Sequence, residues 1–222
     1  MNRRMIAPLI FGLVGTAILM SLGFWQLQRL NWKTGILTEI GARLAQPPVG
    51  LPATLDKFAD KYLQVEVSGQ IETGELHVLT FGQGTPGFRV ISTMVLDDGR
   101  RILVDRGFLP ETQKDAVRYG GDVTAVGSLV WPQETDKYVP APNYDKNIWF
   151  ARDVPLMATA LKTDQVMLAI SRSTNNEGIT PQQVAVNISN RHLEYVMTWF
   201  SLAVIWIGMT GYALWRIKRN IL

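Results

Sequence analysis

The chain has 222 residues, of which 22 are Lys or Arg, 19 are Asp or Glu, two are His and none is Cys. The lack of cysteine excludes disulfides, thiol nucleophiles and Cys-rich metal sites, and two histidines nearly exclude a multi-histidine metal site. Five basic residues lie at the chain ends, and removing them from the 22 leaves 17 against 19 acidic ones, so the net charge of +3 does not indicate nucleic-acid binding.

The first predicted element is an uncharged apolar run, Met5–Trp25. It is about as long as the roughly 20 residues that a helix needs to cross a bilayer. A cleaved signal peptide is the alternative, with Ser21-Leu22-Gly23 as the small-x-small site. The apolar part of a signal peptide is usually only about 7–15 residues long, so the run is interpreted as a membrane span.

Helical spacing continues beyond this run, over Leu27–Ala45. Leu30, Leu37 and Leu44 recur every seven residues, which predicts an amphipathic helix that prolongs the first span. Pro47-Pro48 marks its end. The helix either packs on its own domain or forms a stalk that binds a partner. The first interpretation is favoured, because an apolar stripe usually faces a core.

The middle of the chain changes to short β-type runs that are separated by Gly, Pro and Asp. Asp97-Asp98-Gly99 is a hairpin turn signal. One short helix is predicted over Val154–Lys162, with Asp153 as its N-cap and Pro155 in its first turn. The predicted strands are Tyr62–Ser68, Leu76–Phe81, Phe88–Leu96, Arg101–Arg106, Asp122–Val130, Asn147–Phe150, Val166–Ile170 and Val184–Ile188.

A second uncharged apolar run, Val196–Trp215, predicts a second span. Basic flanks stay on the cytoplasmic side of a membrane. Arg3-Arg4 precedes the first span and three basic residues follow the second, which predicts cytoplasmic termini and an outward-facing central domain. Small residues in the spans permit close helix approach, and these are Gly12, Gly15, Ala17, Gly208 and Gly211.

The predicted fold class is a membrane protein of α+β type: two transmembrane helices flank one antiparallel β-rich extracytoplasmic domain that has a short helix. The predicted location is the inner membrane, with the central domain in the periplasm or, in a mitochondrion, the intermembrane space. The predicted parts are 1–26 (cytoplasmic N-terminus and first span), 27–52 (juxtamembrane helix and Pro-rich linker), 53–190 (β-rich domain), 191–215 (second span) and 216–222 (cytoplasmic C-terminus).

The sequence contains no pattern typical of an enzyme. Gly82–Gly87 lacks the spacing of a phosphate loop, and no G-x-S-x-G elbow is present. No carboxylate pair stands in a context that suggests acid–base catalysis. We therefore predict a protein that is not an enzyme.

Four segments together resemble the Surfeit locus protein 1 family, the membrane factors that assist assembly of haem-copper terminal oxidases. They are Leu22–Lys33 (LGFWQLQRLNWK), Gly87–Met94 with Ile102–Pro110 (GFRVISTM and ILVDRGFLP), Asn147–Leu161 (NIWFARDVPLMATAL) and Val186–Ala203 (VNISNRHLEYVMTWFSLA). Their order, their spacing and the two-span frame all match. Met94 stands where the family often has proline, and Asp105 where it often has asparagine.

The resemblance implies a role in inserting haem a into the large catalytic subunit of a haem-copper oxidase, either a cytochrome c oxidase or a quinol oxidase. It also implies haem A synthase as a partner, beside membrane lipid and without nucleic acid. Bacterial members of the family are able to bind haem a themselves, so haem a is the expected cofactor.

A candidate haem site lies at the start of the second span. His192, Tyr195 and Trp199 are spaced i, i+3 and i+7 and share one helix face, near Trp25 of the first span. A neutral imidazole can ligate haem iron, so His192 is the candidate metal ligand, and the aromatic residues would hold the macrocycle. Arginines pair with propionates, and the candidates are Arg191 beside His192 and Arg106 or Arg89 from the β-rich domain.

Other interpretations compete with this one. Histidine, tryptophan and tyrosine also gather at membrane interfaces without binding a cofactor. Arg106 could equally form a structural ion pair. A haem-free scaffold or accessory subunit bound to the oxidase is the alternative function. A two-span sensor is disfavoured, because the tails outside the spans are only a few residues long.

Overall fold

The computed structural model describes residues 3–82, 84–184 and 191–219. The chain divides into two compact units, a two-helix unit formed by Met1–Glu39 and Val186–Leu222, and a β-rich unit formed by Ile40–Ala185. The predicted strand Val184–Ile188 lies outside the described residues except for its first residue.

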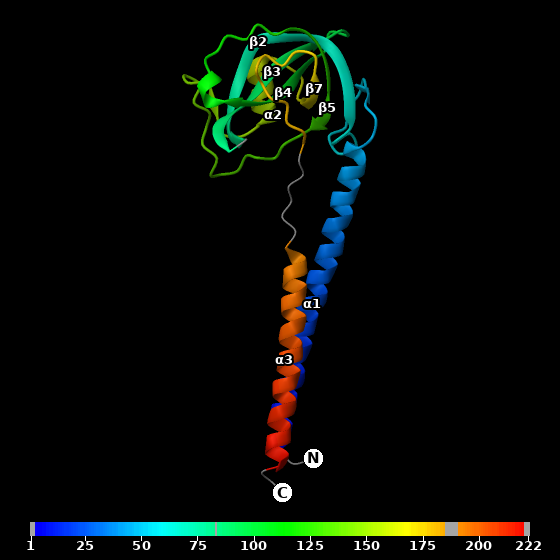
Figure 1. Ribbon diagram of the computed structural model, residues 1–222. Helices are drawn as coiled ribbons and strands as arrows, with labels where there is room; N and C mark the ends of the chain where they lie inside the picture. The colour runs from blue at the N-terminus through cyan, green and yellow to red at the C-terminus, as the bar shows by residue number, and fades with distance from the viewer. Residues whose placement is uncertain (1–2, 83, 185–190, 220–222) are drawn as a thin grey trace. The chain divides into compact units, whose positions relative to one another are not determined.

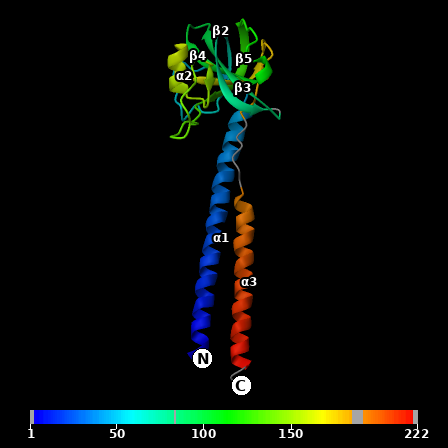
Figure 2. The same ribbon diagram turned by 90° about the vertical axis from the view of Figure 1, so that its left-hand side faces the viewer.

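The two-helix unit pairs α1 (Arg3–Leu44) with α3 (His192–Arg219), and the two helices run side by side in opposite directions (Figures 1 and 2). Both are long and apolar enough to cross a membrane. Their apolar side chains are mostly exposed, unlike those of a core helix in a soluble protein. The predicted helical extension beyond the first span is confirmed, because α1 continues without a break to Leu44.

The β-rich unit is a closed ring of strands. β2 pairs with β3, β3 with β4, β4 with β7, β7 with β5, and β5 again with β2, so that each of these five strands has a partner strand on both sides over part of its length. The strands are β1 (Val49–Gly50), β2 (Gln64–Gly82), β3 (Thr85–Leu96), β4 (Arg101–Pro110), β5 (Gly121–Val130), β6 (Ile148–Trp149) and β7 (Met167–Ser173), and the helix α2 spans Val154–Leu161.

The sheet is mixed, which corrects the purely antiparallel sheet that the sequence predicted. β7 runs parallel to β4 and antiparallel to β5. The long connection after β4, which includes α2, returns the chain to the starting end of β4, as a parallel pairing requires. The short strands β1 and β6 also pair in parallel with β2.

Two predicted strands are one in the structure. β2 includes the predicted strand Leu76–Phe81 and all of the predicted strand Tyr62–Ser68 except its first two residues. Its pairing with β3 shifts register between Ile71 and Glu75. On one edge, the first half of β2 pairs with β5 and the second half pairs with β6. On the other edge, β2 pairs with β3 from Gly69 to Gly82. The predicted hairpin turn is confirmed, since Gly99 has a φ of +86° and donates to the Leu96 carbonyl.

Apolar side chains from both faces of the strands fill the unit. One buried cluster lies inside the ring, and it includes Val65, Ile71, Met94, Ile102, Leu129 and Leu168. A second cluster lies under α2, which packs through Val154, Met157 and Ala158. Trp149 of β6 is buried in this second cluster. The predicted N-cap of α2 is confirmed, because the Asp153 carboxylate accepts from the Leu156 amide at 3.1 Å.

Candidate functional site

The helices α1 and α3 meet along a seam whose residues recur at alternating spacings of four and three. This is the spacing at which helices supercoil around each other. The seam positions are buried or half-buried: Gly12, Thr16, Leu19, Gly23, Gln26 and Leu30 on α1, and His192, Val196, Trp199, Ala203, Trp206 and Thr210 on α3. Most side chains outside these rows are exposed.

Glycines bring the two backbones close together. A Cβ at Gly12 or Gly15 would overlap Thr210 or the Trp206 ring, and the Trp206 indole donates to the Gly12 carbonyl at 3.1 Å. Gly12 and Gly15 therefore permit close approach of α3 to α1. A Cβ at Gly208 or Gly211 would meet no described atom within 4 Å, so these two glycines leave open surface on α3.

His192 begins α3 and makes a hydrogen bond across the seam. Its Nδ1 lies 2.7 Å from the Oε1 of Gln26, whose side chain is buried. The other ring nitrogen, Nε2, has no hydrogen-bond partner among the described residues. The geometry leaves one imidazole nitrogen fixed by an amide and the other open.

The remaining predicted residues of the two-helix unit differ in exposure. Trp199 lies in the seam, and its indole Nε1 is buried without a hydrogen-bond partner among the described residues. Tyr195 and Trp25 are about half exposed, and the guanidinium of Arg29 lies 5.9 Å from the Trp25 ring centre. Arg191 directly precedes the helix, is exposed, and its carbonyl accepts from the Tyr195 amide at 3.4 Å. The unit thus combines an open imidazole nitrogen, an unused indole donor and an exposed arginine.

Arg106 belongs to the β-rich unit and is buried. Its guanidinium donates to Glu177 at 2.8 Å, and the same carboxylate accepts from the amides of Tyr119 and Gly120. Burial alone would raise the pKa of Glu177, but these donors outweigh it and lower that pKa. The structural ion pair that the sequence offered as the alternative for Arg106 is present.

Two of the four segments that carried the family resemblance converge on a second ion-pair cluster. The fully buried Asp105 of β4 accepts from Arg89 of β3 at 2.8 Å and from Arg152, which precedes α2, at 3.1 Å. Arg152 also donates to Glu134. Burial opposes ionisation of Glu134, but Arg152 lowers the pKa of its carboxyl. Arg89 further donates to Gln182 at 2.9 Å, so the cluster joins five separate stretches of the chain.

A third cluster surrounds Glu75 in β2. The carboxylate accepts from His77 Nε2 at 2.8 Å and from two nitrogens of Arg118. Burial would raise the pKa of Glu75, but these two partners outweigh it and hold the pKa at about 2. His77 is buried, as a core residue would be, although its Nδ1 has no partner among the described residues.

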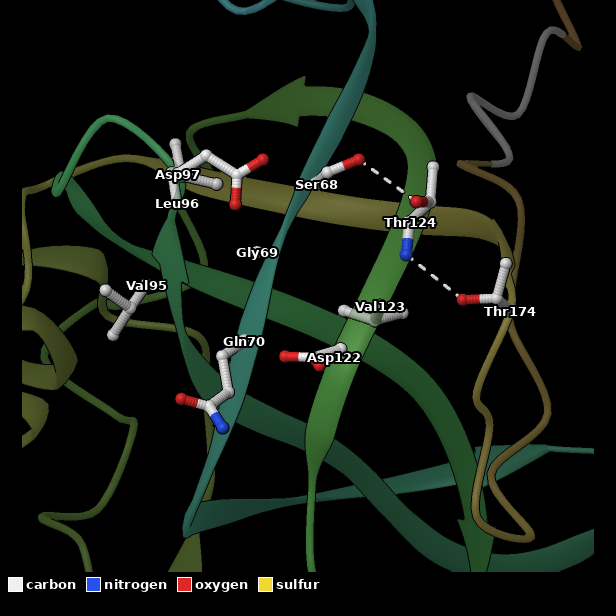
Figure 3. A pocket seen from close by; sticks show the side chains of 10 residues that line it. All are labelled: Ser68, Gly69, Gln70, Val95, Leu96, Asp97, Asp122, Val123, Thr124 and Thr174. Atoms are coloured by element: carbon white, nitrogen blue, oxygen red, sulfur yellow. Dashed lines mark hydrogen bonds between the residues drawn. The ribbon is translucent and has the colours of Figure 1, made fainter.

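A shallow depression crosses β2, β3 and β5 (Figure 3). Its hydroxyls already have protein partners: the Ser68 and Thr124 hydroxyl oxygens are 3.0 Å apart, and the Thr174 hydroxyl accepts from the Thr124 backbone amide at 3.0 Å. Asp97 and Asp122 also line it. No group of three or more His, Cys, Asp or Glu that could hold a metal ion occurs in the part of the chain that the structure describes.

Sequence reasoning did not single out Gln26 as a site residue. The available signal was its position: Gln26 follows Gly23 by three residues, at the polar end of an apolar run, in phase with Gly12. Only the pairing of α1 with α3 shows that this phase faces His192.

Comparison with known proteins agrees with the resemblance seen in the sequence. The SURF1 family model matches residues 13–204. The chain is 30% identical over 208 residues to Surfeit locus protein 1 of Gallus gallus, an alignment that covers 82% of this chain and 67% of that protein. It is 27% identical over 224 residues to a SURF1-like protein of Rickettsia felis, covering 95% of this chain and 96% of that protein. The two-span frame, the β-rich unit and these matches agree, and the chain belongs to the SURF1 family.

Proposed function

We propose that this chain is a non-enzymatic assembly factor for a haem-copper terminal oxidase, and that it presents haem a for insertion into the large catalytic subunit. Membership of the SURF1 family supports the oxidase part of the proposal. The observation that carries the haem part is His192, whose Nδ1 is bonded to Gln26 while Nε2 stays open.

The residues around His192 suit a haem as cargo. A neutral imidazole nitrogen is a common ligand of haem iron. Trp199 offers a buried N–H donor that has no partner among the described residues, and Tyr195 and Trp25 offer aromatic surface. Arg191 is exposed and can pair with a propionate. Arg106 is a weaker candidate for this role, because a propionate would first have to displace Glu177.

The proposed location is the inner membrane, with both termini in the cytoplasm and the β-rich unit in the periplasm. Two apolar helices with basic outer flanks support this orientation. In this arrangement His192 would stand at the periplasmic end of α3. The partners would be the oxidase subunit that receives the haem and haem A synthase, which supplies it.

A haem-free scaffold bound to the oxidase is the second candidate. The observation in its favour is the open surface at Gly208 and Gly211 of α3, where a helix of another protein could approach closely. On this interpretation His192 and Gln26 would only be a polar pair that holds two spans together.

One experiment separates the two candidates. The tagged full chain is co-expressed with the enzymes of haem A biosynthesis, purified in mild detergent, and its haem is identified by chromatography and pyridine haemochrome spectrum. We expect near-stoichiometric haem a in the unchanged chain and its loss in His192→Ala. Tyr212→Ala, an exposed aromatic residue at the other end of α3, is the control and should keep its haem. Oxidase subunits that co-purify without any haem would favour the scaffold.

A further inference from the structure

Gln26 is an uncommon residue for its place. The residue is only 9% exposed and lies in the seam between two apolar helices, where a polar amide without a partner would be costly. Its Oε1 makes a 2.7 Å hydrogen bond with Nδ1 of His192. Two residues later, Gln28 has the same side chain on an exposed face of α1.

We propose that Gln26 is the positioning residue for His192: its amide oxygen accepts the Nδ1–H proton, holds the imidazole in that tautomer, and leaves Nε2 deprotonated and turned away from the seam as the iron ligand. This inference rests on the proposed function. The two ring nitrogens of a histidine are distinct, and the hydrogen bond that one makes decides what the other can do. A partner of this kind fixes both the tautomer and the ring orientation of a metal-binding histidine.

The amide has consequences that a carboxylate at this position would not have. A carboxylate would bring a charge into the apolar seam, where burying an ion is costly. A neutral amide acceptor also raises the basicity of the ligand less than a carboxylate does. A protein that hands its haem to a partner needs an iron bond that is directed but not too strong, and the Gln26 amide supplies both properties.

The first test measures haem binding. Purified full chain in mild detergent is titrated with haem a and followed by its Soret absorbance. We expect Gln26→Leu to weaken binding at least tenfold, in the range seen when outer partners of metal ligands are removed. Gln28→Leu, the matched control, should stay within twofold of the unchanged chain. Gln26→Glu, which keeps an acceptor oxygen, should bind at least as tightly as the unchanged chain.

The second test needs no haem. The chain has only two histidines, so ¹⁵N-histidine labelling gives two imidazoles, and His192→Ala identifies the relevant signals. At alkaline pH the nitrogen shifts and couplings report the tautomer. We expect the Nδ1–H form of His192 in the unchanged chain and in Gln26→Glu, and its loss in Gln26→Leu.

The outcomes separate this inference from the proposed function. An Nε2–H tautomer in the unchanged chain would overturn the inference, since Gln26 would then be the donor and Nε2 would be blocked. Equal haem affinity of Gln26→Leu and Gln28→Leu would also overturn it, while leaving the proposed function intact. Failure of the unchanged chain to bind haem a would overturn the proposed function, and the role of Gln26 toward iron with it.

Discussion

The Glu75 cluster makes the stability of the β-rich unit dependent on pH. The Glu75 side chain is 14% exposed and bonds to both His77 and Arg118, and its pKa is lowered from 4.5 to about 2. One pKa unit corresponds to roughly 1.4 kcal/mol, so ionised Glu75 stabilises the folded state by about 3 kcal/mol at pH 7. Glu75→Gln removes this charge, and we expect it to lower the free energy of unfolding by about that amount.

The pH dependence follows from the direction of the shift. The carboxyl has a lower pKa when folded than when unfolded, so its contribution is complete above pH 4.5 and is lost as the pH falls toward 2. At pH 3 the same relation leaves about 1.4 kcal/mol, so the cost of Glu75→Gln should fall by more than half between pH 7 and pH 3. Urea unfolding at the two pH values, followed by tryptophan fluorescence, measures both costs.

Glu72→Gln is the matched control for this experiment. Glu72 lies three residues earlier in β2 and pairs with Arg101, but its side chain is 41% exposed. A solvent-exposed ion pair contributes at most about 1 kcal/mol, so this variant should cost that or less at pH 7. Equal costs for the two variants, or a Glu75→Gln cost that stays constant between pH 7 and pH 3, would refute the reasoning.

Two further predictions compare pairs of glycines. Gly15→Leu should weaken the pairing of α1 with α3 by about 1–3 kcal/mol, because the new side chain would overlap Trp206. Gly208→Leu should have little effect, because no described atom lies near that position. SDS titration followed by circular dichroism measures the unfolding midpoint of each variant, and equal midpoints would contradict the prediction. Gly107 and Gly121 have positive φ angles of 116° and 110°, so replacing either with Ala strains the backbone. Only Gly107→Ala also brings a Cβ against the Thr180 carbonyl, so this variant should have the lower midpoint in urea unfolding.

The elements of this protein were predictable because their patterns are local. An apolar run of span length reveals a helix without knowledge of its neighbours, and Asp153 followed by Pro155 marks the start of α2 in the sequence alone. Alternation likewise revealed the strands. It carries no information on which strands pair or in which direction, so the parallel pairing of β7 with β4 was missed.

Only part of the candidate site could be predicted from the sequence, because sequence patterns relate residues within one element and not between elements. His192, Tyr195 and Trp199 lie on one helix, and helical spacing alone relates them. Gln26 lies 166 positions away from His192, and their hydrogen bond exists only because α1 packs against α3. The cluster at Asp105 likewise joins residues from separate segments, so the sequence alone did not predict the contacts between them.

The place of β7 in the ring has a consequence for synthesis of the chain. β7 joins β4 to β5, yet it is the last of the ring strands to be made. Until β7 joins the ring, β4 and β5 each lack one partner strand, and such an unpaired edge can associate with other chains. A chain that ends before β7 therefore carries an open sheet, and its two free edges stay exposed to aggregation until β7 closes the ring.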